Sequence, residues 1–202
     1  VSADQNIDTL NIEKDITKKT KAIMAVHLTG RMCDMNTIKK IANKYNIPIL
    51  EDAAQAIGSK FNGDSAGSLS KIGCFSAHPL KNLNAFGDAG YLVTNDRSIA
   101  KKAKSLSNHG IENRNTVRNF GYVSRMDNIQ AAILNYHLKK LNKIINLRRK
   151  NAREYKRLLD TRFIYFPEER PEYFDTYHTF VIQVKKRDAL KSYLEKKGIQ
   201  TS

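Results

Sequence analysis

The sequence predicts an α/β protein: a mostly parallel sheet covered by helices on both faces, followed by the start of a smaller α+β domain. Short, almost uninterrupted apolar runs alternate with amphipathic helical patterns, as a parallel sheet buried on both faces requires. A long helical pattern then leads into a second mixed stretch. We therefore expect a partial large domain over 1–145, and a connecting helix with the start of a truncated small C-terminal domain over 146–202.

The early elements have clear local signals. The apolar run AIMAVHL over 22–28 predicts the first strand, and Asp34 is placed to cap the helix after it. The apolar stripe of that helix is Ile38, Ile41, Ala42 and Tyr45. Three further strands are predicted over 47–50, 72–76 and 90–94. The remaining predictions are a helix over 96–107, a polar loop over 111–122, a long helix over 126–159, a strand over 179–184 and a helix over 188–197.

Charge narrows the range of partners. The chain of 202 residues has a formal net charge of +15, which suits an anionic partner of some kind. Much of this charge lies over 139–157, where apolar residues recur at helical spacing and leave the cations on the opposite face. A solvated helix face is the favoured interpretation there, because no nucleic-acid-binding signature accompanies the cations. We expect no nucleic-acid partner and, since the apolar runs are too short to cross a bilayer, no membrane partner.

The number and spacing of the cysteines indicate whether to expect a metal site and in which cellular compartment the protein works. Cys33 and Cys74 lie far apart and in no spacing typical of a metal site, so no metal is expected. Cysteine use of this kind is typical of a reduced, cytoplasmic protein. Cys74, on an apolar run, is interpreted as a small core residue. Because the chain begins at Val1, we also expect it to be a fragment.

Three polar residues follow predicted strands at points where a ligand could bind. Asp52 comes directly after one strand, Ser76 ends the next, and Lys81 lies five positions later. Ligands of open parallel sheets bind outside the carboxyl ends of the strands. Taken alone, Asp52 could cap a helix and Lys81 could be solvated. Together they suit a cofactor with a basic ring nitrogen, an aldehyde and a phosphate, which describes pyridoxal phosphate.

The chain resembles the DegT/DnrJ/StrS-type aminotransferases, which depend on pyridoxal phosphate and act on nucleotide-linked keto sugars with the aspartate aminotransferase fold (fold type I). The most specific motifs are EDAAQA and, at the right distance, FSAHPLKN. Weaker likeness extends over TKAIMAVHLTG, the SNHG turn and GYVSRMDNIQAAIL. The resemblance covers essentially the whole chain and implies that the part preceding Val1 supplies further phosphate-binding and ring-stacking residues.

The resemblance implies a role for each of four residues. Lys81 matches the lysine that forms a Schiff base with the cofactor and then moves a proton between cofactor and substrate carbons. Asp52 matches the carboxylate that pairs with the pyridinium nitrogen. Gln55 matches a glutamine near the ring and its phenolic oxygen, and Ser76 matches the hydroxyl that binds the phosphate.

The reaction implied is transamination. Relatives that dehydrate sugars carry a histidine where this chain has Lys81. By resemblance the amino donor is glutamate and the acceptor a nucleotide-linked keto sugar, in the synthesis of amino sugars for surface polysaccharide or a natural product. Two alternatives remain: the same fold acting as a sugar dehydratase or on a non-sugar ketone, and a non-catalytic basic module that binds nucleic acid or regulates.

The resemblance also implies a homodimer in which a loop of one subunit reaches the cofactor phosphate of the other. The matching loop is GYVSRMD, and Val123 occupies the position of the asparagine that usually makes this contact. A valine side chain cannot donate a hydrogen bond. The backbone, Ser124 or Arg125 is therefore expected to substitute for it, and weaker phosphate binding is the alternative. For Arg125, an ion pair with a nearby carboxylate is the alternative role. For His27 and His109, structural hydrogen bonding is favoured over contact with substrate.

Overall fold

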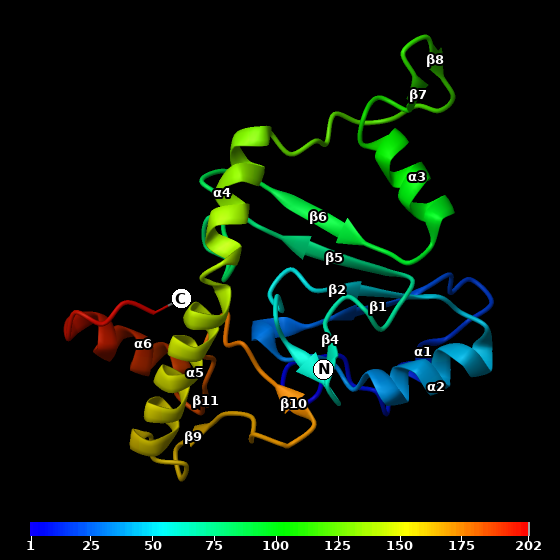
Figure 1. Ribbon diagram of the computed structural model, residues 1–202. Helices are drawn as coiled ribbons and strands as arrows, with labels where there is room; N and C mark the ends of the chain where they lie inside the picture. The colour runs from blue at the N-terminus through cyan, green and yellow to red at the C-terminus, as the bar shows by residue number, and fades with distance from the viewer. Residues whose placement is uncertain (202) are drawn as a thin grey trace.

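A four-stranded sheet in the order β1-β2-β5-β6 forms the centre of the molecule (Figure 1). The computed structural model describes residues 1–201. β1 (Ile23–Val26), β2 (Ile49–Asp52) and β5 (Ile72–Ser76) pair in parallel, whereas β6 (Gly90–Val93) pairs antiparallel with β5. The predicted α/β class and the mostly parallel sheet are therefore confirmed.

One face of the sheet packs against helix α2 (Met35–Tyr45). The side chain of Asp34 accepts the backbone N–H of Thr37 at 3.1 Å, so the predicted cap is confirmed. Asn46, in the left-handed conformation, ends the helix. The core between helix and sheet includes Ile23, Ala25, Met35, Ile38, Ile41 and Ile49.

The opposite face of the sheet carries Asp52. The register makes Val26, Asp52, Cys74 and Leu92 Cα partners across the four strands, so their side chains share this face. Met24 is 58% exposed and Val26 is 38% exposed in the part of the chain that the structure describes. Cys74 is exposed as well, so its interpretation as a core residue is wrong. Strand alternation places it beside Asp52 and away from the packed face.

Helix α3 (Arg97–Leu106) follows the sheet, and a hairpin follows α3. Asp96 caps the helix by accepting the N–H groups of Ser98 and Ile99. The stretch predicted as a polar loop contains β7 (Ile111–Asn113) and β8 (Thr116–Val117), which project away from the rest of the molecule (Figure 1). The hairpin lacks an apolar period because neither of its faces packs on a core, so pattern alone could not reveal it.

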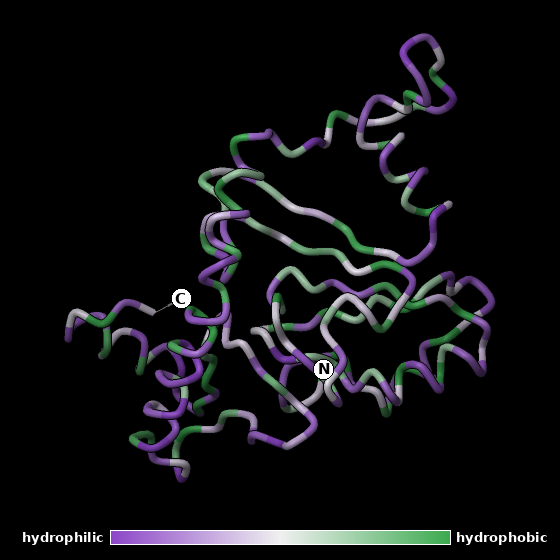
Figure 2. Tube along the Cα trace, in the orientation of Figure 1, coloured by the Kyte–Doolittle hydropathy of each residue, from purple (hydrophilic) through white to green (hydrophobic). Residues whose placement is uncertain are grey.

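The predicted long helix is in fact two helices, α4 (Asn128–Leu138) and α5 (Leu141–Leu158), separated at Lys139 and Lys140. No proline or glycine marks this break in the sequence. α5 is largely hydrophilic, with apolar residues at intervals (Figure 2). The predicted domain boundary at residue 145 falls inside α5, and the division into two domains stays a prediction.

The C-terminal part returns to the sheet region through short elements. β10 (Tyr173–Phe174) pairs antiparallel with β3 (Lys60–Phe61), which in turn pairs with β4 (Asp64–Ser65). The strand predicted over 179–184 is only β11 (Gln183–Val184), which pairs with β9 (Ile164–Tyr165). The other short elements are α1 (Ile12–Asp15), a 3-10 turn (Leu28–Gly30) and α6 (Arg187–Lys196). Within residues 1–201, no helix is both long enough and apolar enough to cross a membrane.

Candidate active site

Asp52 and Ser76 lie on the same face of the sheet at the carboxyl ends of neighbouring strands. Asp52 is the Cα partner of Cys74, and Ser76 follows two residues later on the same side. Asp52 Oδ1 accepts the N–H of Ala54 at 3.0 Å, which leaves Oδ2 available to a ligand. Ser76 Oγ accepts the N–H of His78 at 3.3 Å and keeps its own hydroxyl proton to donate. A carboxylate and a hydroxyl donor thus lie on one face of the sheet, near the ends of neighbouring strands.

Lys81 lies on a turn directly after β5. Its backbone N–H donates to the carbonyl oxygen of His78 at 2.8 Å, which closes the turn. The side chain is half-buried, and within residues 1–201 its Nζ makes no hydrogen bond or ion pair. Among the lysines of α5, by contrast, Lys156 Nζ donates to Pro167 O and to the hydroxyl of Tyr177. Within the described residues, the amine of Lys81 is therefore not held by another side chain or by a carbonyl group.

Helix α4 holds the loop that follows Lys81. Leu83 and Ala85 are buried in a cluster with Leu134 of α4. Gln130 Oε1 accepts the N–H of Phe86 at 2.9 Å, and His137 Nδ1 lies 2.7 Å from Asn84 O. Packing and hydrogen bonds from one helix thus fix both sides of the loop, so the loop can present Lys81 in a defined direction.

Gln55 joins the end of β2 to the turn after β1. Its Oε1 accepts the N–H of Thr29 at 2.7 Å, so the amide NH₂ group is left as the donor for any ligand. Thr29 has a φ of 61°, a conformation that is unfavourable for a β-branched residue. Strain at this turn therefore accompanies the placement of Gln55.

Residues 175–179 form a segment, here called the strap, that crosses from the C-terminal part to the turn after β1. The N–H of Thr176 donates to Gly30 O at 2.9 Å, and Asn82 Nδ2 donates to Thr176 O at 3.2 Å. A Cβ on Gly30, which has a φ of +95°, would lie 2.8 Å from Thr176 Oγ1 and 2.9 Å from the backbone nitrogen of Tyr177. Only glycine permits the strap to approach this closely.

The strap brings in His178, which sequence analysis missed. Its Nδ1 is buried and has no hydrogen-bond partner within residues 1–201. Burial, together with the nearby cations of Lys81 and Arg148, lowers the pKa of His178 to about 4. The imidazole is therefore neutral at pH 7 and lies in the electrostatic environment of Lys81. No local motif could have shown this, because His178 reaches the site from the far end of the chain.

The lowered pKa of His178 predicts acid sensitivity. Between its ordinary pKa near 6.5 and about 4, the unfolded chain binds a proton at this residue that the folded chain excludes. The stability contributed by neutral His178 is thus present above pH 6.5 and is lost as the pH falls to about 4. We expect His178→Asn to weaken the decline in unfolding free energy over this window, as measured by urea denaturation. If the unfolding free energy of the variant fell as steeply with pH as that of the wild type, His178 would not be the cause of the acid sensitivity.

His27 and Glu51 form a fully buried pair behind the candidate site. Cys33 N–H donates to His27 Nδ1 at 3.2 Å, so the ring proton is on Nε2, which donates to Glu51 Oε2 at 3.0 Å. Glu51 also accepts the N–H groups of Gly67 and Leu69, both at 2.8 Å. Burial acts to raise the pKa of Glu51, but these hydrogen bonds lower it overall. The interpretation of His27 as a structural residue is supported, since it is 0% exposed.

Arg125 and Ser124 are not brought to Asp52 or Lys81 by this chain. Both side chains are exposed, and neither has a side-chain hydrogen bond or ion pair within residues 1–201. Val123 is 69% exposed and forms an isolated antiparallel bridge with Asn108. The ion pair considered for Arg125 is therefore not found in the described residues. The role of this loop toward a second subunit stays a prediction.

Comparisons with known proteins give one consistent answer. The profile of the DegT/DnrJ/EryC1/StrS aminotransferase family matches residues 2–202. A dTDP-3-amino-3,6-dideoxy-alpha-D-galactopyranose transaminase of Aneurinibacillus thermoaerophilus is 43% identical over 97% of this chain and 54% of its own length. A pleiotropic regulatory protein of Geobacillus stearothermophilus is 40% identical over the same shares. The chain thus spans about half the length of the curated relatives it matches.

A solved structure agrees with the fold. A Bacillus subtilis protein solved with bound cofactor PMP superimposes with a TM-score of 0.85 at 34% identity. The match covers 98% of this chain and 46% of that one. Because the likeness extends over nearly the whole chain, it includes the sheet and the loop that carries Lys81.

Proposed function

The chain belongs to the DegT/DnrJ/EryC1/StrS aminotransferase family, and on that premise we propose that the full-length protein uses pyridoxal phosphate to move an amino group from glutamate to a nucleotide-linked keto sugar. The observation that carries this proposal is the position of three polar groups at, or just after, the ends of two neighbouring strands. Asp52 and Ser76 share a face, and Lys81 lies on the next turn with its amine unengaged within residues 1–201.

The residues present fit pyridoxal phosphate. Asp52 Oδ2 would accept the pyridinium N–H, and the Ser76 hydroxyl would donate to the phosphate. The amide NH₂ of Gln55 would donate to the phenolic oxygen, since its Oε1 is already bonded to Thr29. When bound, the cofactor supplies an aldehyde that condenses with amines and a ring that accepts electron density.

Lys81 is proposed as the catalytic group of this chain. Its amine would hold the cofactor by condensing with the aldehyde, with loss of water, and as a free amine would move a proton between cofactor and substrate carbon atoms. Arg148 donates to Tyr177 O and His178 O, and so helps to hold the strap. A lysine at position 81 favours transamination over the dehydration performed by relatives with histidine there.

The basic charge supports an anionic small-molecule substrate more than a nucleic acid. On α5, Arg149 donates to Asp175 O and Arg148 donates to two strap carbonyls, so these cations serve the fold. The remaining excess of positive charge would draw a nucleoside diphosphate toward the protein. The regulatory name of one relative keeps the non-catalytic alternative open to test.

A homodimer in the cytoplasm is part of this proposal. Phe120 is fully exposed, and Tyr122 and Val123 are 74% and 69% exposed on the loop between the projecting hairpin and α4. Large apolar side chains exposed together are typical of a contact surface. Within residues 1–201, Cys33 and Cys74 are free thiols, which agrees with a reducing compartment.

The test is a visible absorption spectrum of the purified full-length protein with added pyridoxal phosphate, before and after borohydride reduction. We expect an absorption band that glutamate bleaches, and a reduced adduct on the peptide that contains Lys81. Salt-sensitive retention on DNA without a band would favour the regulatory alternative. A band that glutamate leaves unchanged, with water lost from a sugar substrate, would favour the dehydratase.

A further inference from the structure

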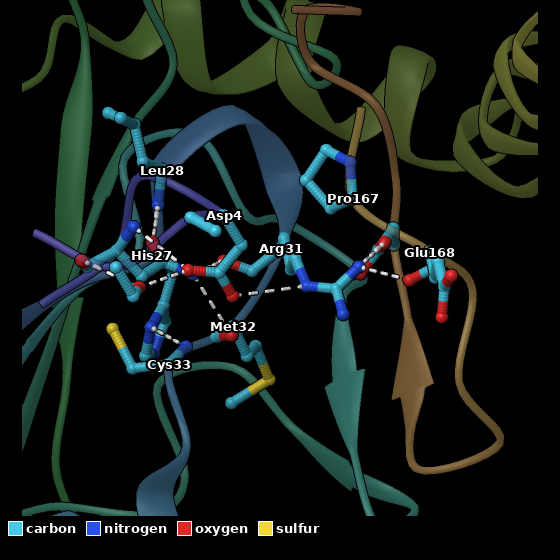
Figure 3. Close-up of polar contacts among 12 residues, drawn as sticks. Asp4, His27, Leu28, Arg31, Met32, Cys33, Pro167 and Glu168 are labelled. Atoms are coloured by element: carbon cyan, nitrogen blue, oxygen red, sulfur yellow. Dashed lines mark hydrogen bonds and ion pairs between the residues drawn. The ribbon is translucent and has the colours of Figure 1, made fainter. Parts of the chain in front are cut away.

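Arg31 is a buried cation that joins three segments distant in sequence (Figure 3). Its NH1 donates to Glu168 O at 2.9 Å and to Asp175 Oδ2 at 3.0 Å. Its Nε lies 3.4 Å from Asp4 Oδ2, and the guanidinium carbon lies 4.3 Å from the centre of the Tyr173 ring. One side chain thus contacts the N-terminal segment, the chain before β10 and the first residue of the strap.

The contact with Asp175 is sensitive to the exact position of the strap. The side chains of Arg31 and Asp175 are only 7% and 9% exposed. Asp175 Oδ1 has no hydrogen-bond partner within residues 1–201, and burial raises the pKa of this carboxyl. A buried ion pair adds little stability over an apolar pair, but separating its members leaves a charge without compensation. The pair therefore favours one placement of the strap over all others.

The strap in turn connects Arg31 to the candidate site. Immediately after Asp175, Thr176 accepts a hydrogen bond from Asn82, the residue next to Lys81. Thr176 Oγ1 also lies 2.8 Å from Ser59 Oγ, which donates to Gly30 O at 2.7 Å. Two residues before Arg31, the N–H of Thr29 donates to Gln55 Oε1. The turn 29–31 is therefore the point at which the strap meets the site.

We propose that Arg31 is a positioning residue of the candidate site: its ion pair with Asp175 holds the strap against the turn after β1, and so sets the position of His178 relative to Lys81. This inference rests on the proposed function. Within residues 1–201, no hydrogen bond or ion pair joins the strap to Asp52 or Ser76, the proposed partners of the pyridinium nitrogen and the phosphate. We therefore expect its placement to affect the acceptor substrate more than the cofactor.

The experiment uses the full-length protein with Arg31→Gln, which keeps length and a donor but removes the charge. We expect the KM for the acceptor sugar to rise at least about tenfold, with the Kd for pyridoxal phosphate within about threefold of wild type. Hydrogen exchange of amides over 173–180 should accelerate at least about tenfold, while exchange over 49–52 stays unchanged. Arg31→Lys, which restores the charge but not the planar fork, should recover part of both effects.

Arg162→Gln is the matched control, because Arg162 forms an exposed ion pair with Asp160 and should leave all three measurements unchanged. If Arg31→Gln does not fold, Asp175→Asn tests the same contact from the strap with the same expected results. Wild-type KM and wild-type exchange over 173–180 would overturn the inference. So would uniformly faster exchange with a lowered Tm, because that result would make Arg31 a purely structural residue.

The experiment distinguishes failure of the proposed function from failure of the inference about Arg31. If wild-type protein formed no adduct at Lys81, the assigned chemistry would fall. Exchange over 173–180 would still decide whether Arg31 places the strap.

Discussion

Replacing Lys81 by alanine in the full-length protein is expected to abolish amino transfer and the borohydride-stable adduct together. Its half-buried amine is unengaged within residues 1–201, on a turn held by packing and hydrogen bonds from α4. Removing a positioned proton-transfer group costs about 10²–10⁴-fold in rate, and loss of the covalent link adds to this. The measurement is the rate of amino transfer from glutamate, with mass analysis of the peptide containing residue 81.

The matched control is Lys60→Ala, at the exposed position of strand β3, which should keep both the rate and the adduct. Cofactor binding through Asp52 and Ser76 should persist in Lys81→Ala, so the variant should still retain pyridoxal phosphate noncovalently. An adduct found at another lysine in the wild-type protein, with full activity of Lys81→Ala, would show that Lys81 is an ordinary surface cation.

The second large effect is expected from His27→Ala. Glu51 would keep its two backbone donors but lose the His27 Nε2–H, and the ring would leave a cavity beside a buried charge. Separating a buried pair of this kind costs about 3–5 kcal/mol. We expect a loss of that size in the unfolding free energy of the full-length protein, measured by urea denaturation at pH 7.

Two comparisons give the result its meaning. His27→Gln keeps a donor and should cost clearly less, whereas His109→Asn, at an exposed position, should fall within about 0.5 kcal/mol of wild type. Because the pKa of Glu51 is lowered in the folded protein, ionised Glu51 adds to the unfolding free energy at pH values above the ordinary pKa of a carboxyl group. This stabilisation is lost as the pH falls below that pKa. The difference between wild type and His27→Ala should therefore shrink in acid. A pH-independent difference would contradict a charged Glu51.

Local chemistry explains which parts of the fold could be predicted. Helices α2 and α3 could be predicted from Asp34 and Asp96, because an N-cap is a contact between one side chain and backbone N–H groups within the next three residues. The parallel strands were visible because both of their faces carry apolar residues. The hairpin β7–β8 and the break at Lys139 and Lys140 could not be predicted from the sequence, because no local pattern of residue types marks them.

The same distinction applies to the candidate site. Asp52 and Ser76 could be predicted to share one edge of the sheet because the ends of neighbouring parallel strands meet there, and the proximity of Lys81 to them stays a prediction. His178 could not, because it arrives by tertiary packing of the strap against Gly30. The loop with Arg125 is placed neither by a strand end nor by packing within this chain, since its predicted partner is a second subunit.

The distance in sequence that the strap bridges has a kinetic consequence. Arg31 and Asp175 are 144 positions apart, whereas the strands of the sheet follow one another at shorter intervals. Closing so long a loop reduces the entropy of the chain before any stabilising contact has formed. Contacts of this kind therefore tend to form late in folding. Nascent chain leaving the ribosome could assemble the sheet and the Lys81 turn while the strap is still unsynthesised. Competence for chemistry would then appear only after translation has passed residue 179.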